Sequence, residues 1–145
     1  MYDVLIIGAG PAGLFTAYEL IEKNKDLKIG LLERGSKVKS RVCPMNKKGV
    51  PCQNCKPCAV LSGYGGAGTF SDGKLNFIPK LGKSDLTKYM TESKANKLIE
   101  DTENIFNKFK MDAEIYPSNI DEAEEIKKKV AINGAKLLLI KQKHL

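Results

Sequence analysis

Residues 4–14 read Val-Leu-Ile-Ile-Gly-Ala-Gly-Pro-Ala-Gly-Leu. A short, β-branched apolar run here ends at a cluster of glycines, which is typical of a strand buried on both faces of a parallel sheet. We therefore predict a strand over residues 3–7. Pro11 suits the first turn of a helix, where its missing N–H costs no hydrogen bond. Apolar residues then recur at spacings of three and four, which predicts a helix over residues 11–23.

A second apolar run covers residues 28–32, after a polar break at 24–26, and ends at Glu33. This run predicts a second strand, which completes a βαβ unit with a right-handed crossover. The predicted fold class is therefore α/β, a Rossmann-like domain that opens with a βαβ unit and a parallel sheet.

The glycines of the first stretch form the pattern G-x-G-x-x-G at Gly8, Gly10 and Gly13. The first glycine permits a sharp exit from the strand, the second lets the backbone approach a pyrophosphate, and the third lets the helix pack on the strand. Pro11 and Ala12 complete the turn. The free N–H groups of the helix N-terminus would face the anion.

Glu33 lies 20 residues after Gly13, at the end of the second predicted strand. A carboxylate there can accept hydrogen bonds from both ribose hydroxyls of an adenosine, and it disfavours a 2′-phosphate. The simpler alternative is a glycine turn that only joins strand to helix, which would make the position of Glu33 a coincidence. We predict dinucleotide binding, although this fingerprint alone does not choose between FAD and NAD.

The rest of the chain divides into three kinds of segment. Residues 36–62 contain all four cysteines. Their apolar residues show neither a helical nor a strand period, which predicts a long loop. In the glycine-rich segment 63–77, apolar residues flank Asp72-Gly73 in a way that predicts a tight hairpin. Beyond Lys83 the composition turns to Lys, Glu and Asn, so we expect domains over 1–83 and 84–145.

Two helices and a strand are predicted beyond residue 83. An apolar stripe that runs from Ala95 to Phe109 predicts a long amphipathic helix. Asp121 as N-cap, with Glu124 three residues later and Gly134 after the end, predicts a second helix. Residues 136–140 are expected to form a strand.

Two stretches of the sequence resemble known flavoproteins. Residues 4–14, together with Leu32-Glu33-Arg34-Gly35, resemble the opening of the large FAD-dependent, two-dinucleotide-binding flavoprotein superfamily. Residues 63–75, Gly-Tyr-Gly-Gly-Ala-Gly-Thr-Phe-Ser-Asp-Gly-Lys-Leu, resemble the signature of a family known only as FAD-dependent dehydrogenases of unknown substrate. The resemblance implies an oxidoreductase that binds FAD and a small-molecule substrate or electron partner.

The resemblance also implies which residues contact FAD. Gly65, Gly66 and Gly68 would run beside the pyrophosphate and the ribityl chain. Lys74 would pair with phosphate or tune the flavin, or else be a solvated turn lysine, and Asp72-Gly73 has a simpler interpretation as a plain turn. The implied FAD-binding set is Gly8, Gly10, Pro11, Ala12, Gly13, Glu33, Arg34, Gly65, Gly66, Ala67, Gly68, Ser71, Asp72 and Lys74.

Family chains are several times longer than 145 residues, and Lys143-His144-Leu145 resembles the start of a family segment that normally continues with Gly-Thr. We therefore expect the first part of a longer enzyme, and no catalytic residue can be assigned. His144, the single histidine, is expected to be a passenger. Three alternatives stay open: a truncated, non-catalytic FAD-binding remnant, a cysteine-ligated redox module, and an NAD-binding dehydrogenase domain.

The four cysteines, Cys43, Cys52, Cys55 and Cys58, lie in one loop. Their spacing resembles ferredoxin-type [4Fe-4S] ligation, although the remote cysteine here precedes the triplet. A tetrahedral zinc site needs the same ligands. Redox-active dithiol chemistry and ordinary free thiols are the alternatives.

The net charge is +7, and the 24 Lys and Arg residues are spread along the chain. The densest run, residues 127–129, lies beside glutamates on a predicted helix and is best explained as a solvated face. We expect no nucleic-acid partner, because no matching motif accompanies the charge. The absence of a basic leader and of a long apolar run predicts no membrane association and a cytoplasmic location.

Overall fold

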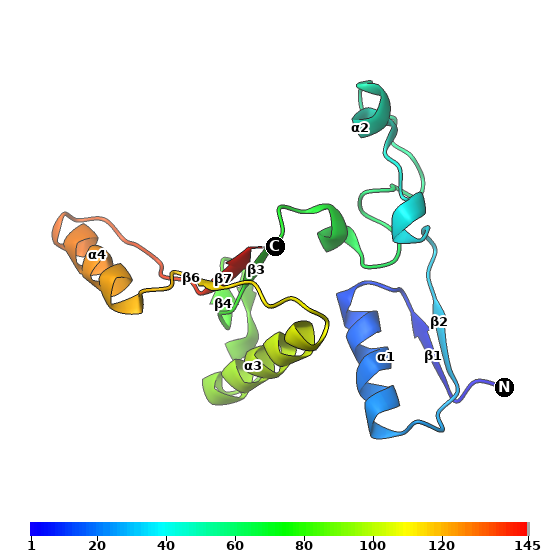
Figure 1. Cartoon of the computed structure of the whole chain (residues 1–145), viewed down its shortest axis with the longest axis horizontal. Helices are drawn as coiled ribbons and strands as arrows, with labels where there is room; N and C mark the ends of the chain where they lie inside the picture. The colour runs from blue at the N-terminus through cyan, green and yellow to red at the C-terminus, as the bar shows by residue number, and fades with distance from the viewer. Residues whose placement is uncertain (145) are drawn as a thin grey trace. The chain divides into compact units, whose positions relative to one another are not determined.

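The computed structural model describes residues 1–144, which form two compact units: Met1–Ser71 and a second that begins at Asp72 (Figure 1). The structure is mixed α/β, as predicted. The expected domains, 1–83 and 84–145, stay a prediction.

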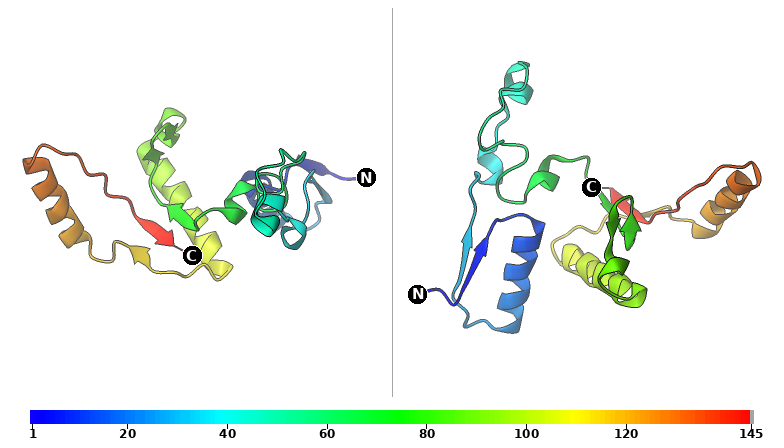
Figure 2. Two further views of the ribbon diagram at one scale, coloured as in Figure 1. Left: turned by 90° about the horizontal axis from the view of Figure 1, so that it is seen from above. Right: turned by 180° about the vertical axis from the view of Figure 1, so that it is seen from behind.

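The first unit opens with a βαβ arrangement. Strand β1 (Val4–Ile7) and strand β2 (Ile29–Leu32) pair in parallel, with Val4 opposite Ile29 and Ile7 opposite Leu32. Helix α1 (Pro11–Lys23) connects them and lies alongside both strands (Figure 2). The predicted helix is confirmed residue for residue, and each strand begins one residue later than predicted.

Strand β1 exposes one of its faces, contrary to the prediction that it is buried on both. Val4 and Ile6 are half-buried, whereas Leu5 is 53% and Ile7 75% exposed. A Cβ on Gly13 would lie 3.3 Å from Ile6 Cγ2, so α1 covers the face that Ile6 belongs to. Within residues 1–144 these strands form a two-stranded sheet. The apolar run is therefore covered on one face only, although both faces carry apolar side chains.

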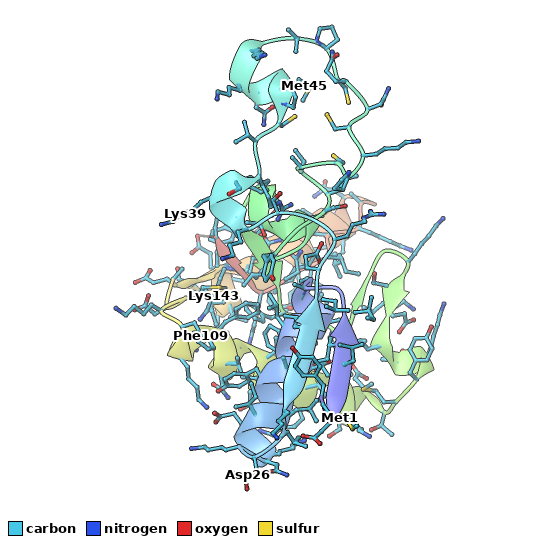
Figure 3. All side chains as sticks on the ribbon, turned by 90° about the vertical axis from the view of Figure 1, so that its right-hand side faces the viewer. Met1, Asp26, Lys39, Met45, Phe109 and Lys143 are labelled. Atoms are coloured by element: carbon cyan, nitrogen blue, oxygen red, sulfur yellow. The ribbon has the colours of Figure 1, made fainter. Side chains whose placement is uncertain are left out.

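The cysteine-rich segment contains two short helices, so the prediction of a loop without helix over 36–62 is wrong in part. A 3₁₀ turn, η1, spans Val38–Ser40, and helix α2 spans Pro44–Lys48. Cys43 is the N-cap of α2, and Gly49, with φ +65°, ends it in the left-handed conformation that favours glycine. Figure 3 shows this segment, marked by Lys39 and Met45, extending beyond the ends of β1 and β2. A further 3₁₀ turn, η2 (Ala67–Phe70), lies near the end of the unit.

The second unit combines two helices with short antiparallel strands. Strands β3 (Lys74–Asn76), β7 (Gln142–His144) and β6 (Ile115–Tyr116) form one sheet in that order, and β4 (Lys80–Leu81) pairs with β5 (Ser84–Asp85). A 3₁₀ turn, η3 (Leu86–Lys88), precedes helix α3 (Glu92–Lys108). Along the chain, helix α4 (Ile120–Ile132) follows β6 and precedes β7. The long amphipathic helix predicted for this region is confirmed as α3.

The predicted hairpin at Asp72-Gly73 is wrong. The residues before it form the 3₁₀ turn η2, so no strand is present there to pair with β3. Instead β3 pairs with β7, with Lys74 opposite His144. The predicted strand over 136–140 is also wrong, because the strand that pairs with β3 and β6 is Gln142–His144.

The start of α4 differs from the prediction by two residues. Asn119, and not Asp121, is the N-cap, and its Oδ1 accepts a hydrogen bond from the Glu122 N–H at 3.1 Å. The predicted end is confirmed, since Gly134 follows the helix with φ +78°. None of the helices in residues 1–144 has the length and apolar character needed to cross a bilayer.

Candidate dinucleotide-binding site

Two positions in the turn after β1 require glycine for steric reasons. Gly8 has φ +97°, in the left-handed region, and its N–H donates to the Leu32 carbonyl at 2.7 Å. A Cβ on Gly13 would collide with the Gly8 carbonyl oxygen. Glycine at these positions therefore permits the sharp exit from β1 and the close approach of α1 to the strand.

Gly10 has a different role, because a Cβ there would meet no atom within 4 Å. Its backbone is extended (φ −75°, ψ −179°) and forms the N-cap of α1. No side chain caps this helix, and no acidic residue lies in its first turn. The first N–H groups of a helix lack intrahelical partners and carry partial positive charge. The N-terminus of α1 is thus open to an anion such as a diphosphate.

Glu33 follows β2 and reaches back to this turn. Its Oε2 accepts a hydrogen bond from the Ala9 N–H at 2.8 Å, and its Oε1 accepts one from the Gly35 N–H at 2.7 Å. The Ala9 N–H, and next the Gly35 N–H, stabilise the carboxylate and hold the pKa of Glu33 below its usual value. Each carboxylate oxygen has capacity for another donor. The structure therefore fixes an ionised acceptor beside the mouth of α1.

The second glycine-rich segment packs on the first. The Gly65 N–H donates to the Ala9 carbonyl at 2.8 Å. Gly66 has φ +70°, and a Cβ on it would lie 3.3 Å from Gly10 Cα and 3.1 Å from Pro11 Cδ. Two motifs more than fifty residues apart in the sequence are thus brought together. Ala67 and Gly68 follow in η2, where the Ser71 hydroxyl donates to the Gly68 carbonyl at 2.9 Å.

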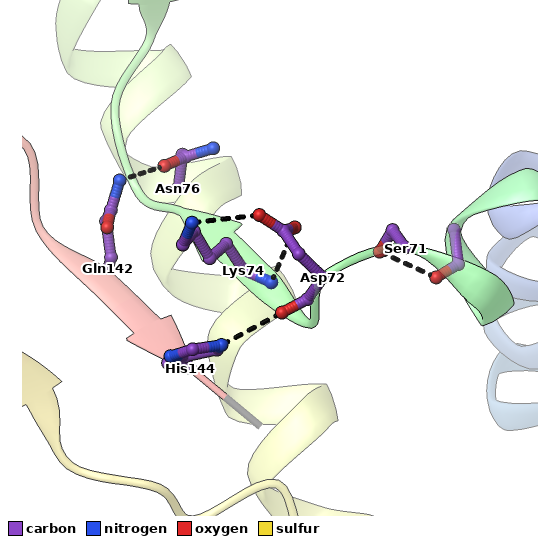
Figure 4. Close-up of polar contacts among 7 residues, drawn as sticks. Ser71, Asp72, Lys74, Asn76, Gln142 and His144 are labelled. Carbon is purple, nitrogen blue, oxygen red and sulfur yellow. Dashed lines mark hydrogen bonds and ion pairs between the residues drawn. The ribbon is translucent and has the colours of Figure 1, made fainter.

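Arg34 is exposed, and its Nη2 is 3.4 Å from Ser62 Oγ. Asp72 and Lys74 belong to the second unit and pair with each other, with Lys74 Nζ 2.9 Å from Asp72 Oδ2 (Figure 4). Hydrogen bonding from Lys74 lowers the pKa of Asp72. His144 Nε2 lies 2.9 Å from the Asp72 carbonyl oxygen. The FAD contacts assigned to Arg34, Asp72 and Lys74 stay predictions.

Arg41 is a residue of this site that sequence reasoning missed. It is 6% exposed and donates four hydrogen bonds to backbone carbonyls between residues 59 and 66. Its guanidinium carbon also lies 4.6 Å from the centroid of the Phe70 ring. One signal was present: Arg34 and Arg41 are the two arginines of a chain whose other basic residues are lysines. An isolated arginine in that setting favours a role that needs its planar fork of donors.

All four cysteines are free thiols; Cys52 and Cys55 are exposed, and Cys43 and Cys58 are half-buried. Across residues 1–144, no group of three or more His, Cys, Asp or Glu side chains is placed to hold a metal ion. The arrangement therefore does not support the iron–sulfur or zinc site, which stays a prediction that metal analysis of the purified protein would test.

Two comparisons with known proteins match part of the chain. A family model described as lycopene cyclase protein matches residues 3–48. A mitochondrial electron transfer flavoprotein-ubiquinone oxidoreductase from Arabidopsis thaliana is 47% identical over 49 residues, which are 31% of this chain and 8% of that protein. No solved structure matches the chain. The family match covers the βαβ unit with its glycine-rich turn and Glu33.

Proposed function

We propose that this chain binds FAD as the N-terminal part of an FAD-dependent dehydrogenase whose substrate is unknown. The observation that carries the proposal is the convergence of two features at the carboxyl ends of β1 and β2. One is the uncapped N-terminus of α1, and the other is the Glu33 carboxylate fixed by the Ala9 and Gly35 N–H groups. Ligands of α/β folds bind at this edge of a parallel sheet.

The proposal gives the diphosphate and the adenosine ribose separate contacts. The N–H groups in the first turn of α1 would hold the diphosphate, and the open space at Gly10 would let it approach the backbone. Glu33 would accept hydrogen bonds from the adenosine ribose. Gly65 and Gly66 would flank the diphosphate, because they pack directly on the turn. When bound, FAD supplies hydride or electron transfer, and the protein orients it.

FAD is favoured over NAD for two reasons. The second glycine segment, which the flavoprotein resemblance assigns to the FAD pyrophosphate, packs on the phosphate turn. The relative that matches is named as an electron transfer flavoprotein-ubiquinone oxidoreductase. Because the matched part covers 8% of that relative, the catalytic activity of this chain is itself part of the proposal. A non-catalytic chain that binds only the adenosine end of FAD is the alternative.

The assigned ribose contact gives the test. Glu33→Ala should weaken FAD binding by at least about tenfold, since a hydrogen bond to a charged group contributes about 1.5–3 kcal/mol. FMN lacks the adenosine, so its affinity should change much less. Both affinities are measured by flavin fluorescence titration, with Glu22→Ala on the exposed side of α1 as the matched control. Equal losses for FAD and FMN would refute the ribose contact, and a parent chain that binds no FAD would refute the function.

A further inference from the structure

Arg41 binds main-chain carbonyls from two parts of one segment. Its Nε donates to Ala59 O at 2.8 Å, and its Nη2 donates to Val60 O at 2.6 Å. Its Nη1 donates to both Tyr64 O and Gly66 O at 2.9 Å. One side chain therefore fixes the start and the end of residues 59–66, which we name the 59–66 segment.

The charge of Arg41 has no counter-ion in the part of the chain that the structure describes. No ion pair there includes it, although the residue is only 6% exposed. Removing a cation from water is costly unless polar groups replace its hydration. The four carbonyl oxygens and the Phe70 ring face, 4.6 Å away, provide that replacement. A lysine has three donors on a single nitrogen, so it cannot reach all four carbonyls in this geometry.

The bonds of Arg41 continue directly into the phosphate-binding turn. Gly66, whose carbonyl accepts from Arg41, lies against Gly10 and Pro11. Its neighbour Gly65 donates to Ala9, whose own N–H donates to Glu33. A continuous set of contacts thus runs from the guanidinium through Gly65 and Gly66 to the turn and its carboxylate.

We propose that Arg41 is a positioning residue for dinucleotide binding, because it holds the 59–66 segment so that Gly65 and Gly66 stay against the turn at residues 8–13. Arg41 acts through these glycines. The inference rests on the proposed FAD site for its functional consequence, but the positioning itself can be measured without any ligand.

Amide hydrogen exchange of the full chain, free of ligand, tests the positioning. In Arg41→Met and in Arg41→Lys, the amides of Gly65 and Gly66 should exchange at least about tenfold faster, which corresponds to about 1.4 kcal/mol of lost protection. The amides of α1 should exchange as in the parent chain. Unchanged exchange at Gly65 and Gly66, or full recovery in Arg41→Lys, would overturn the proposal, since recovery would show that charge alone suffices.

FAD titration of the same variants tests the consequence, and both should bind FAD about tenfold more weakly. Arg41→Ala adds a readout that separates this role from general stability. Guanidinium chloride at low millimolar concentration should restore its FAD affinity, whereas equal ammonium chloride should not. Failure of guanidinium to restore binding would count against the proposal. If the parent chain binds no FAD, the proposed function fails, while the exchange experiment still decides whether Arg41 positions the glycines.

Discussion

Glu33 joins the turn after β1 to the backbone after β2 through its side chain. It accepts hydrogen bonds from Ala9, in the turn after β1, and from Gly35, beyond β2. The carboxylate that we assign to the ribose therefore also fixes the backbone around the phosphate turn. Its position was predictable, because the fingerprint requires an acid at the end of the second strand. Its hydrogen bond from the Ala9 N–H could not be predicted, because the sequence does not show which backbone N–H a side chain will accept from.

Glu33 should make the stability of the first unit depend on pH. Its hydrogen bonds to N–H groups lower the pKa of Glu33 below the usual value of 4.5 in the folded chain. A lowered folded pKa gives a contribution that is complete above pH 4.5 and is lost as the pH falls through the folded pKa. Urea midpoints of Glu33→Gln should therefore fall less steeply below pH 4.5 than those of the parent chain. Identical slopes for Glu33→Gln and the control Glu22→Gln would contradict this.

The glycines at positions 10 and 13 should respond differently to alanine. Gly13→Ala would force a methyl group against the Gly8 carbonyl and should cost about 1–3 kcal/mol of unfolding free energy. Gly10→Ala meets no atom within 4 Å, so it should cost at most about 1 kcal/mol at this N-cap but weaken FAD binding about tenfold. Urea denaturation and flavin titration separate the two effects. A Gly10→Ala chain with parental FAD affinity would argue against a ligand close to this backbone.

Local signals predicted the elements of the first unit, whereas long-range pairing decided those of the second. The apolar period of helix α1 begins at Pro11 and stops at the polar break over residues 24–26. The sequence therefore defines both ends of the helix. Strand β7 pairs with β3, whose residues lie close to seventy positions earlier, and no local pattern records that pairing. The more apolar residues 136–140 had the stronger strand pattern, yet residues 137–140 line a pocket with Ala123 and Ile126 of α4. Non-local contacts thus override local preference there.

The cap of α4 allows a direct test of its start. Asn119→Ala removes the side-chain acceptor of the Glu122 N–H and should destabilise the helix by about 1 kcal/mol. Asp121→Ala removes only a favourable charge from the first turn and should cost about 0.3–1 kcal/mol. Chemical denaturation followed by circular dichroism compares the two variants. A larger loss of stability for Asp121→Ala than for Asn119→Ala would support Asp121 as the N-cap, as the sequence predicted.

A partly buried ion pair attaches β7 to α3. Lys143 Nζ lies 3.0 Å from Glu103 Oε1 and 2.8 Å from Asn107 Oδ1, and the side chains of Lys143 and Glu103 are 6% and 21% exposed. Lys143→Met leaves the Glu103 charge without this partner and should cost about 2–3 kcal/mol, less than for a fully buried pair. Adding Glu103→Gln should recover part of the loss. Strictly additive effects in this double-mutant cycle would show that the pair contributes nothing specific.

At the scale of the whole molecule, both units have little hydrophobic core. Among residues 1–144, Ala9 and Ala95 are the buried apolar residues, while Ile7 is 75% and Ile132 85% exposed. Each unit therefore depends strongly on hydrogen bonds and ion pairs, such as those of Arg41 and Lys143. Composition could not predict this distribution, because burial depends on how the elements meet.

The most direct test of the central claim is a ¹H–¹⁵N NMR titration of the chain with FAD. If the ligand binds at the mouth of α1, the largest shift changes should fall on the amides of residues 8–10, 12 and 13 and of Gly35, Gly65 and Gly66, all within the first unit. Glu33→Ala should reduce these changes at equal FAD concentration. Saturable binding that leaves these amides unmoved while others shift would contradict the assigned site.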